Sequence, residues 1–272
     1  MFFHSFNSQT FVEQEKTMAL ITITSDLGTR DFYLAALKGA IITNTGFVNI
    51  VDVTHTIKPF DIKEAAFTVK SMFRYYPAGT IHIIHVNSTD GKDKLLLAVV
   101  DGHYFLTFDN GFLSLAFEKM PHQTYEVNAE LLENSSLLYE EAIGKVVNLL
   151  VKEFQPSDFG HLTTETINFR LMQPITSPGS IRGTIINIDN YGNAIVNITR
   201  AMFDQFIGDK RFSVLANVGT SKEISKKYND VDEGEMVCLF NASGYLEVAI
   251  NKGKAENLLG LKIDAPVLVL AD

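Results

Sequence analysis

Residues 21–41, ITITSDLGTRDFYLAALKGAI, decide the fold of the first half of this chain. They begin with an alternating apolar and threonine run at residues 21–24, which is typical of a β-strand. The polar stretch 25–28 interrupts this run, and from Asp31 the apolar residues recur at helical spacing as far as Ile41. A strand, a tight turn and a helix in this order form the first half of a βαβ unit.

Asp26 stands directly after the predicted strand. In sheets built from βαβ units, ligands bind just beyond the carboxyl ends of the strands. A carboxylate at that place can accept hydrogen bonds from the vicinal hydroxyls of a ribose, or it can cap the helix that follows. This stretch alone leaves both roles open.

The rest of the first half continues the alternation of strands and helices. Asp61 and Glu64 have the spacing of a capping box at the start of a helix. Strands are predicted at residues 48–53, 81–86, 95–100 and 104–108, and helices at residues 61–75, 111–118 and 138–154. This order predicts an α/β N-terminal domain with a largely parallel sheet over residues 18–154.

The pattern changes after residue 154. Residues 155–180 lose their periodicity and contain Pro156, Pro174 and Pro178, so we expect a linker there. Short β runs follow at residues 183–188, 194–198, 212–216, 236–240, 245–250 and 266–270. Turn residues separate these runs, which predicts an all-β C-terminal domain, a small sandwich or barrel, over residues 181–272.

Composition excludes several classes of partner. The chain has 272 residues and a net charge of −9, and it shows no basic patch of the kind that nucleic acids require. Its one cysteine, Cys238, lies in an apolar run that reads as a buried strand, so we expect core packing and no disulfide within the chain. This use of cysteine suits a reducing cytoplasm.

No segment of the sequence indicates a membrane span or a signal peptide. A span needs about 18 consecutive apolar residues, and no such run is present. Residues 1–17 lack the basic start and apolar core of a signal peptide, and we expect a disordered extension with Met18 as an alternative start.

Common cofactor motifs are also missing. His82 and His85 are three residues apart on a predicted strand and so point to opposite faces, which argues against a shared metal ion. No G-x-G-x-x-G follows the first strand, and neither a G-x-x-x-x-G-K-[ST] loop nor a G-x-S-x-G elbow occurs. We therefore expect no metal and no dinucleotide cofactor. Residues 189–193 and 241–245 read as hairpin turns by composition alone.

Six short motifs, in order, resemble one family. They are SDLGTRD with LKG at residues 25–39, D-x-x-H-x-x-x-P-x-D at 52–61, YPAGT at 76–80, DNG at 109–111, IDNYGN at 188–193 and NASGYL at 241–246. Together they resemble the S-adenosylmethionine hydroxide adenosyltransferases, which are relatives of the bacterial fluorinase and chlorinase. The resemblance extends from about residue 20 to residue 269.

The resemblance implies a fold, an assembly and a reaction. The fold is an α/β N-terminal domain and a β-barrel-like C-terminal domain, and the assembly is a homotrimer whose ligand lies between subunits. The substrate is S-adenosyl-L-methionine, without a further cofactor, and displacement at the ribose C5′ releases L-methionine. By the same resemblance Asp26 and Asp31 belong to the substrate-binding residues, with Asp26 on the ribose hydroxyls, and Phe60 lines the ribose and the sulfonium.

The second domain supplies the other half of the implied site. Asp189 would meet the methionine ammonium and Asn193 the adenine edge. Tyr228 would stack on the adenine, and the turn at Ala242 and Ser243 would face the methionine carboxylate. A sulfonium needs little acid help to leave, so such a site mainly positions the reactants and excludes water.

The sequence departs from the family at the residues that activate water. The hydrolases use an Asp–Arg–His set, and here Asn87, Lys94 and Leu138 fall at those places, with Asp90 as a candidate replacement for the missing Asp. Losing positioned acid–base help can cost ~10²–10⁴-fold in rate. The halogenase pattern is not met either, since its halide-binding hydroxyl falls at about Tyr139 and the carboxylate of Asp90 would repel a halide. We therefore expect a hydrolase of S-adenosylmethionine, with a binding protein that has lost catalysis as the alternative and a halogenase as a third.

Overall fold

The computed structural model describes residues 18–88, 94–117, 119–133, 139–170 and 172–271. Contacts within the chain divide it into two compact units, Met1–Ile167 and Asn168–Asp272. The expected extension at residues 1–17 lies outside the described residues, as do Asp90 and Leu138.

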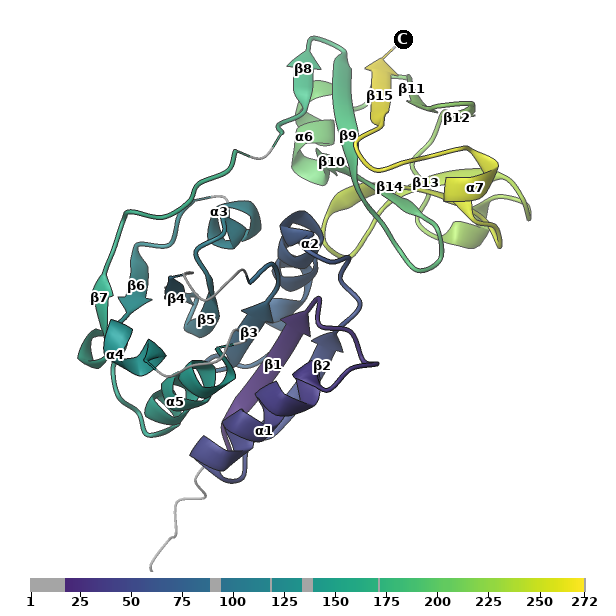
Figure 1. Cartoon of the computed structure of the whole chain (residues 1–272). Coiled ribbons are helices and arrows are strands. Elements are labelled where there is room, and N and C mark those ends of the chain that lie inside the picture. The colour runs from purple at the N-terminus through teal and green to yellow at the C-terminus, as the bar shows by residue number, and fades with distance from the viewer. Residues whose placement is uncertain (1–17, 89–93, 118, 134–138, 171, 272) are drawn as a thin grey trace, which may run out of the picture. The chain divides into compact units, whose positions relative to one another are not determined.

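Seven strands form the sheet of the first unit, in the order β2-β1-β3-β5-β4-β6-β7 (Figure 1). Their bounds are β1 (Leu20–Ser25), β2 (Asn49–Thr54), β3 (Ile81–His85), β4 (Leu95–Val100), β5 (His103–Phe108), β6 (Gln123–Val127) and β7 (Gly160–Leu162). The strands β2, β1, β3 and β5, which are neighbours in this order, are parallel. The pairs β5–β4, β4–β6 and β6–β7 are antiparallel. The predicted parallel arrangement is thus confirmed for the half of the sheet that contains β1, and the whole sheet is mixed.

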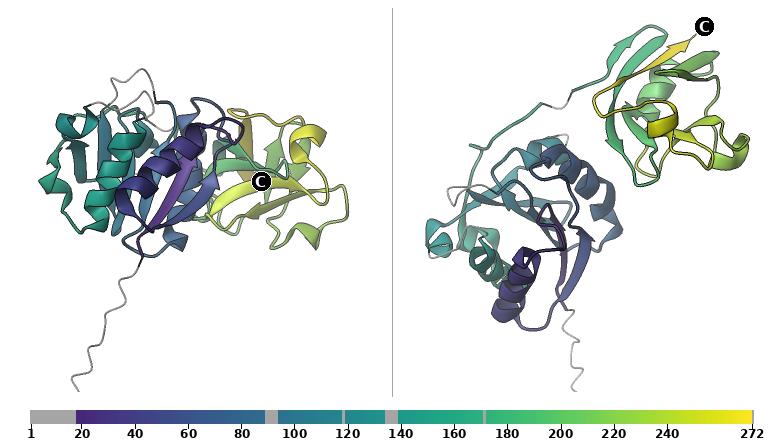
Figure 2. Two further views of the ribbon diagram at one scale, coloured as in Figure 1. Left: turned by 60° about the horizontal axis from the view of Figure 1, so that its bottom comes forward. Right: turned by 45° about the vertical axis from the view of Figure 1, so that its right-hand side comes forward.

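Helices cover both faces of this sheet. Their bounds are α1 (Tyr33–Thr45), α2 (Ile62–Met72), η1 (Phe73–Tyr75), α3 (Phe112–Ala116), α4 (Ala129–Leu132), α5 (Glu140–Val151) and η2 (Pro156–Asp158). Figures 1 and 2 show α1 and α5 side by side, and α2 lies with α3. Ile83 packs into the core under α1 and α5, whereas its neighbour Ile84 packs into the core under α2 and α3. All of β3 is therefore buried, as expected of a parallel strand covered on both faces.

The start of α2 shows one half of the predicted capping box, because the Glu64 carboxylate bonds the amide of Lys58 and not that of the N-cap residue. Asp61 is the N-cap residue, and its Oδ1 accepts a hydrogen bond of 3.0 Å from the Glu64 amide. Glu64 in turn accepts 3.1 Å from the amide of Lys58. These bonds satisfy amides that a helix start leaves free, and they fix the chain just after Phe60.

The second unit is built from antiparallel strands. Their bounds are β8 (Ile175–Ser177), β9 (Ser180–Ile188), β10 (Ala194–Thr199), β11 (Phe212–Ala216), β12 (Gly219–Ser221), β13 (Met236–Phe240), β14 (Tyr245–Ile250) and β15 (Pro266–Ala271). The long strand β9 pairs with β15 through its first half and with β10 through its second. A Cβ at Gly183 would lie 2.6 Å from Cγ1 of Ile198, so the missing side chain lets the sheet fold over itself into a barrel-like shape.

Short helices α6 (Arg200–Phe206), η3 (Tyr228–Asp230) and α7 (Ala255–Leu258) complete this unit. Cys238 lies in the core of the unit on β13 and is fully buried, which confirms its predicted packing role. Burial raises the pKa of its thiol to about 12, so the reactive thiolate is not formed at neutral pH.

Regular structure also occurs within residues 155–180, where the sequence indicated a linker. η2 and β7 extend the first unit, and β7 pairs with β6 at the edge of its sheet. β8 pairs with β9 in the second unit. The division between the units falls between these two short strands.

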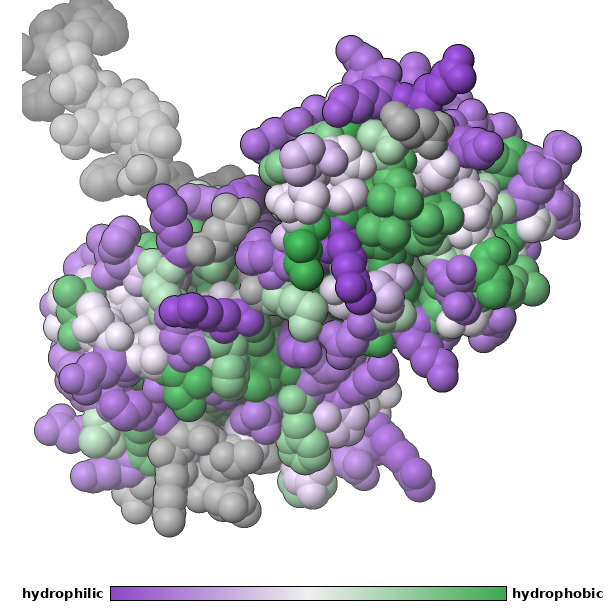
Figure 3. All heavy atoms as spheres, turned by 90° about the horizontal axis from the view of Figure 1, so that it is seen from above, coloured by the Kyte–Doolittle hydropathy of each residue, from purple (hydrophilic) through white to green (hydrophobic). Residues whose placement is uncertain are grey.

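Many large apolar side chains are internal, and others are exposed. Phe47, Tyr75 and Tyr191 are among the exposed ones. Figure 3 shows apolar groups set among many polar side chains on the face in view. Among the described helices, none has both the length and the apolar character that crossing a bilayer requires.

Candidate functional site

The carboxylate of Asp26 is held by two backbone amides. Its Oδ2 accepts 2.8 Å from the amide of Phe60 and 3.2 Å from the amide of Asn87. Both donors adopt left-handed backbone conformations, with φ of 70° and 51°. Such conformations are costly for residues other than glycine and concentrate at functional sites. Here they turn two N–H groups, one from the turn after β2 and one from the turn after β3, onto a single oxygen.

The second oxygen of Asp26 faces a different situation. Within the described part of the chain, Oδ1 accepts no hydrogen bond, and the residue is half-buried. Helix α1 begins after Phe32 as N-cap, without a side-chain cap. Asp26 is therefore not the cap of the next helix, so the capping role that the sequence left open does not apply. Its hydrogen-bond partners are the backbone amides of Phe60 and Asn87. A fixed carboxylate with one free oxygen can receive hydroxyl groups.

Two other candidates of the first unit are Phe60, which contacts this carboxylate, and Asp31. Phe60 donates its backbone amide to Asp26, and the residue is 67% exposed. Asp31 is exposed in the bend before α1, which begins two residues later than the sequence pattern indicated. Phe32 and Tyr33 place their rings in contact at the start of the helix, with 4.5 Å between the centroids.

The candidates for water activation separate in the structure. Asn87 reaches Asp26 through its amide. Lys94 pairs with Glu126 of β6, with 2.8 Å between Nζ and Oε2. β4, which follows Lys94, is three strands away from β1, or roughly 14 Å at the usual strand spacing. The described contacts thus join Asn87 to Asp26 and pair Lys94 with β6.

The place of the halogenase hydroxyl is occupied by a buried ring. Tyr139 precedes α5 with φ of 53°, and it is 3% exposed. Its ring packs against that of Phe108, with 5.2 Å between the centroids.

In the second unit, Asp189 organises the turn between β9 and β10. Its Oδ1 accepts 2.9 Å from the amides of Tyr191 and Asn193, and its Oδ2 accepts 3.1 Å from Nδ2 of Asn193. Because an ionised carboxylate only accepts, the last bond fixes the orientation of the Asn193 amide. Asn193 is 6% exposed, so this orientation is also held by packing.

Glu247 is a buried carboxylate beside this turn, and sequence analysis did not identify it. It lies on β14, is 3% exposed, and accepts 2.7 Å from the hydroxyl of Tyr228 through Oε1. Burial raises the pKa of Glu247 more than the bond from Tyr228 lowers it, and the nearby charge of Asp189 raises it further. Burial and the bond to Glu247 raise the pKa of Tyr228 as well. The sequence feature that could have identified Glu247 is that it is the only charged residue in the otherwise mostly apolar run 245–250.

Strand pairing explains why these groups meet. Glu247 stands opposite Ile195 on β10 and Leu239 on β13, so the three side chains share one face of the sheet. Asn193 and Asn241 lie two residues from Ile195 and Leu239, which places them on the same face. Leu246 and Val248, the neighbours of Glu247, point instead into the core of the unit.

Ala242 and Ser243 form the exposed tip of the hairpin between β13 and β14. Asn241 holds this tip, because its Oδ1 accepts 3.0 Å from the amide of Ser243 and 3.1 Å from the amide of Tyr245. The arrangement leaves the tip fixed and open to a ligand.

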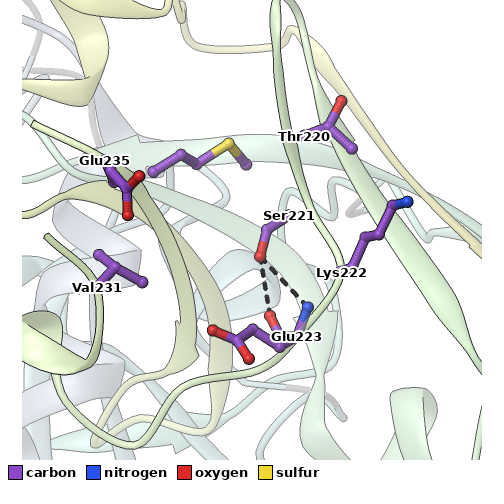
Figure 4. A pocket seen from close by; sticks show the side chains of 7 residues that line it. Thr220, Ser221, Lys222, Glu223, Val231 and Glu235 are labelled. Atoms are coloured by element: carbon purple, nitrogen blue, oxygen red, sulfur yellow. Dashed lines mark hydrogen bonds between the residues drawn. The ribbon is translucent and has the colours of Figure 1, made fainter.

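A pocket of about 400 Å³ lies elsewhere in the second unit, between β12 and β13 (Figure 4). The seven residues that line it are Thr220, Ser221, Lys222, Glu223, Val231, Glu235 and Met236. Among these residues, Ser221 Oγ donates a hydrogen bond to the carbonyl oxygen of Glu223 and accepts one from its backbone amide. None of the candidate residues faces this pocket. In the described part of the chain, no three His, Cys, Asp or Glu side chains are grouped to hold a metal ion.

The fold defines a protein of two units, one α/β and one antiparallel β, and each unit carries a turn in which backbone amides hold a carboxylate. Family models of the SAM hydroxide adenosyltransferase N-terminal and C-terminal domains match residues 21–145 and 183–268. The chain therefore belongs to the SAM hydroxide adenosyltransferase family.

Curated relatives match nearly the full length. An (R)-S-adenosyl-L-methionine hydrolase of Thermus thermophilus is 26% identical, with 93% of this chain and 100% of the relative covered. The corresponding protein of Methanocaldococcus jannaschii is 23% identical, with 91% and 94% covered. A fluorinase of Actinoplanes is 25% identical, with 92% and 97% covered.

A solved structure shares the fold. An uncharacterised conserved protein of Thermotoga maritima superposes with a TM-score of 0.83 at 23% identity, covering 92% of this chain and all of the other. At this identity the likeness speaks for the fold alone.

Proposed function

We propose that this protein hydrolyses S-adenosyl-L-methionine to adenosine and L-methionine. The observation that carries the proposal is the Asp26 carboxylate, fixed by two left-handed backbone amides with one oxygen left for a diol. Family membership supports the identity of that diol as the ribose of an adenosyl group. The names of the curated relatives support hydrolysis.

In the proposed complex the first unit holds the ribose. The free Oδ1 of Asp26 accepts the ribose hydroxyls, and charge-assisted bonds of this kind are about twice as strong as neutral ones. The exposed ring of Phe60 lies against the ribose and the sulfonium, where it excludes water from the leaving group. Asp31 adds a second carboxylate at the start of α1.

The second unit holds the two ends of the ligand. Asp189 meets the methionine ammonium, and Asn193 presents its amide oxygen to the adenine, since its nitrogen is bonded to Asp189. Tyr228 stacks on the adenine, with its hydroxyl held by Glu247. The tip at Ala242 and Ser243 receives the methionine carboxylate.

The chemical step needs little from the protein beyond placement. A water oxygen forms a bond to C5′ while the C5′–S bond breaks, and the electron pair of that bond neutralises the sulfonium. The water loses a proton to the surrounding solvent or to a nearby base. Proximity and orientation alone can supply a large share of such a rate enhancement.

A binding protein without catalysis is the second candidate. Two observations favour it. Asn87 stands where the hydrolases carry an Asp, and its backbone amide donates to Asp26. Lys94 forms an ion pair with Glu126. A halogenase is the third candidate, favoured by the fluorinases among the relatives.

The decisive experiment incubates the full chain at high concentration with S-adenosylmethionine and follows adenosine by chromatography. Adenosine release above the buffer rate, and its loss in Asp26→Ala, is the result expected. Micromolar binding by calorimetry without release supports the binding protein instead. No binding of any adenosyl ligand refutes both.

A halide series completes the test. Adding chloride or fluoride leaves the rate of substrate loss unchanged for a hydrolase and raises it for a halogenase. The product then carries the halogen at C5′.

We also propose a homotrimer with the two half-sites joined across subunits, working in the cytoplasm. The single buried cysteine suits a reducing compartment. Light scattering coupled to size exclusion gives the mass, and a monomer with full activity contradicts the shared site.

A further inference from the structure

Four side chains run through the first unit, from α1 to the strand end that carries Asp26, and they are joined by two hydrogen bonds and one ion-pair contact. Lys38 Nζ lies 2.7 Å from Asp52 Oδ2, and Asp52 Oδ1 lies 3.1 Å from His55 Nε2. His55 Nδ1 lies 2.8 Å from Ser25 Oγ. Ser25 is the last residue of β1 and the chain neighbour of Asp26.

The charges of this relay fix the direction of its bonds. Burial raises the pKa of Asp52, but hydrogen bonds from Lys38 and His55 outweigh it and hold the pKa below its ordinary value. Asp52 is therefore an acceptor at neutral pH, which places a hydrogen on His55 Nε2. When Nε2 carries the hydrogen, Nδ1 accepts from the hydroxyl of Ser25.

The relay is not a nucleophilic triad. In serine hydrolases Nε2 of the imidazole takes the serine proton and Nδ1 faces the carboxylate. Here the two nitrogens are exchanged, and Ser25 is fully buried. A hydroxyl that no substrate can reach does not attack one.

His55 instead holds the chain on both sides of Asp26. Its ring bonds the side chain of Ser25, and its carbonyl oxygen accepts 2.9 Å from the amide of Gly28. His55 is 6% exposed, so both bonds are protected from water. The residues between these two anchors include Asp26 and little else.

We propose that the relay Ser25–His55–Asp52–Lys38 is a positioning device for Asp26. It fixes residues 25–28 so that Oδ2 meets the amides of Phe60 and Asn87 while Oδ1 stays presented to the ligand. The inference rests on the proposed function, because that function gives Asp26 its ligand.

The same strand provides a matched control. Thr22 Oγ1 lies 2.7 Å from Nδ1 of His82, and both residues are fully buried. This is again a hydroxyl on β1 bonded to a buried imidazole, but three residues earlier and without a bond to residues 26–28. Deleting either hydroxyl leaves one imidazole nitrogen unpaired, so both variants lose stability in a similar way.

The test compares Ser25→Ala with Thr22→Val in the full chain. The first readout is hydrogen exchange at the amides of Phe60 and Asn87, and it needs no ligand. Exchange rises about tenfold in Ser25→Ala, equivalent to about 1.4 kcal/mol, and stays within about twofold in Thr22→Val. The second readout is the Kd for S-adenosylmethionine, which rises about tenfold in Ser25→Ala only. Where turnover is present, KM rises and kcat changes less.

Equal behaviour of the two variants in both readouts overturns the proposal. If the unmodified protein binds no adenosyl ligand, the proposed function fails, and the exchange comparison still judges the relay. Lys38→Met tests the far end and is the second variant if Ser25→Ala does not fold. This substitution speeds hydrogen exchange at the Phe60 amide by about two- to threefold, since a bond to a charged group contributes modestly at a partly exposed pair. Unchanged exchange at Phe60 shows that Lys38 takes no part in the relay. That result contradicts a positioning device of four residues.

Discussion

The two half-sites hold their carboxylates by different means. At the end of β1, backbone amides of two left-handed residues grip Asp26. In the second unit, Asp189 also accepts from two backbone amides, but side-chain bonds are added to them, from Asn193 to Asp189 and from Tyr228 to Glu247. Backbone amides persist when side chains change, whereas a side-chain network depends on the identity of every member. The arrangement around Asp26 is thus specified by the path of the chain, and that in the second unit by the path of the chain together with its residue types.

The carboxylates Asp26 and Glu247 also differ in their exposure to solvent. Asp26 is half-buried with one oxygen open, while Glu247 is 3% exposed and works through Tyr228. A carboxylate that touches the ligand must stay accessible. One that positions another residue is free to be buried, and its pKa rises as a result.

The largest effect is expected from Asp26→Asn. Asparagine has the same shape and can turn its oxygen toward the amides of Phe60 and Asn87, which leaves an NH₂ group where the ribose hydroxyls bind. Losing two charge-assisted bonds weakens binding of S-adenosylmethionine by about 100-fold or more. Calorimetry measures the loss, and circular dichroism shows an unfolding transition within about 1 kcal/mol of the original.

Asp101→Asn is the control for that variant. Asp101 is an exposed carboxylate in the same unit, paired with Arg74 at 2.8 Å. It takes the same change of charge without contact to Asp26, so its affinity stays within about twofold. An equal loss of affinity in both variants shows that overall charge, and not the amide-held carboxylate, governs binding.

Two substitutions of Tyr228 come next in size. Tyr228→Ala removes the ring and costs about 1–3 kcal/mol of ligand affinity, the usual contribution of one aromatic side chain stacked on a base. Tyr228→Phe keeps the ring and loses only the bond to Glu247, so affinity falls a few-fold. Titration with adenosine measures both, and equal losses in the two variants refute the stacking role.

Much of the fold follows from sequence periodicity. The strand–turn–helix at residues 21–41 gave the right elements because apolar alternation and helical spacing report local burial directly. β6 was missed because QTYEV has little apolar character, and its pairing with β4 and β7 makes it a strand. β4 was predicted as a strand, but its antiparallel direction was not, because strand direction is set by the pairing partners and not by the sequence pattern.

The site was less accessible from sequence. The position of Asp26 at a strand end was predictable from the sequence. Its hydrogen bonds from the amides of Phe60 and Asn87 were not, because they depend on positive φ at residues other than glycine, which no local sequence pattern predicts. Glu247 was missed because a single charge in an apolar strand gains its meaning only from Tyr228 and from the strands on either side. Tertiary contacts carry this information.

A smaller effect, on stability, is expected from Glu247→Gln. The pKa of Glu247 is raised above its ordinary value of 4.5, so its protonated form is favoured in the folded protein. Its contribution to stability is fully present below pH 4.5 and is lost as the pH rises through the folded pKa. Glutamine does not ionise, so the variant gains stability relative to the original protein as the pH rises above 4.5.

Thermal unfolding from pH 4 to pH 8 measures that gain, and Glu256→Gln on the exposed start of α7 is the control. Glutamine still accepts from the hydroxyl of Tyr228, so ligand affinity falls only about two- to threefold. A constant difference in Tm across the pH range contradicts the burial of an ionising group.

The smallest effect is expected from Asn87→Gly, which tests whether the first half-site depends on the chain path alone. Glycine adopts the φ of 51° without strain and keeps the amide that bonds Asp26. Relief of strain and the greater freedom of the unfolded chain oppose each other, so the free energy of unfolding changes by about 0.5 kcal/mol or less. Affinity and turnover both persist if Asn87 acts through its backbone. A loss of turnover with unchanged affinity gives the side chain a catalytic role, and the first half-site then also depends on residue type.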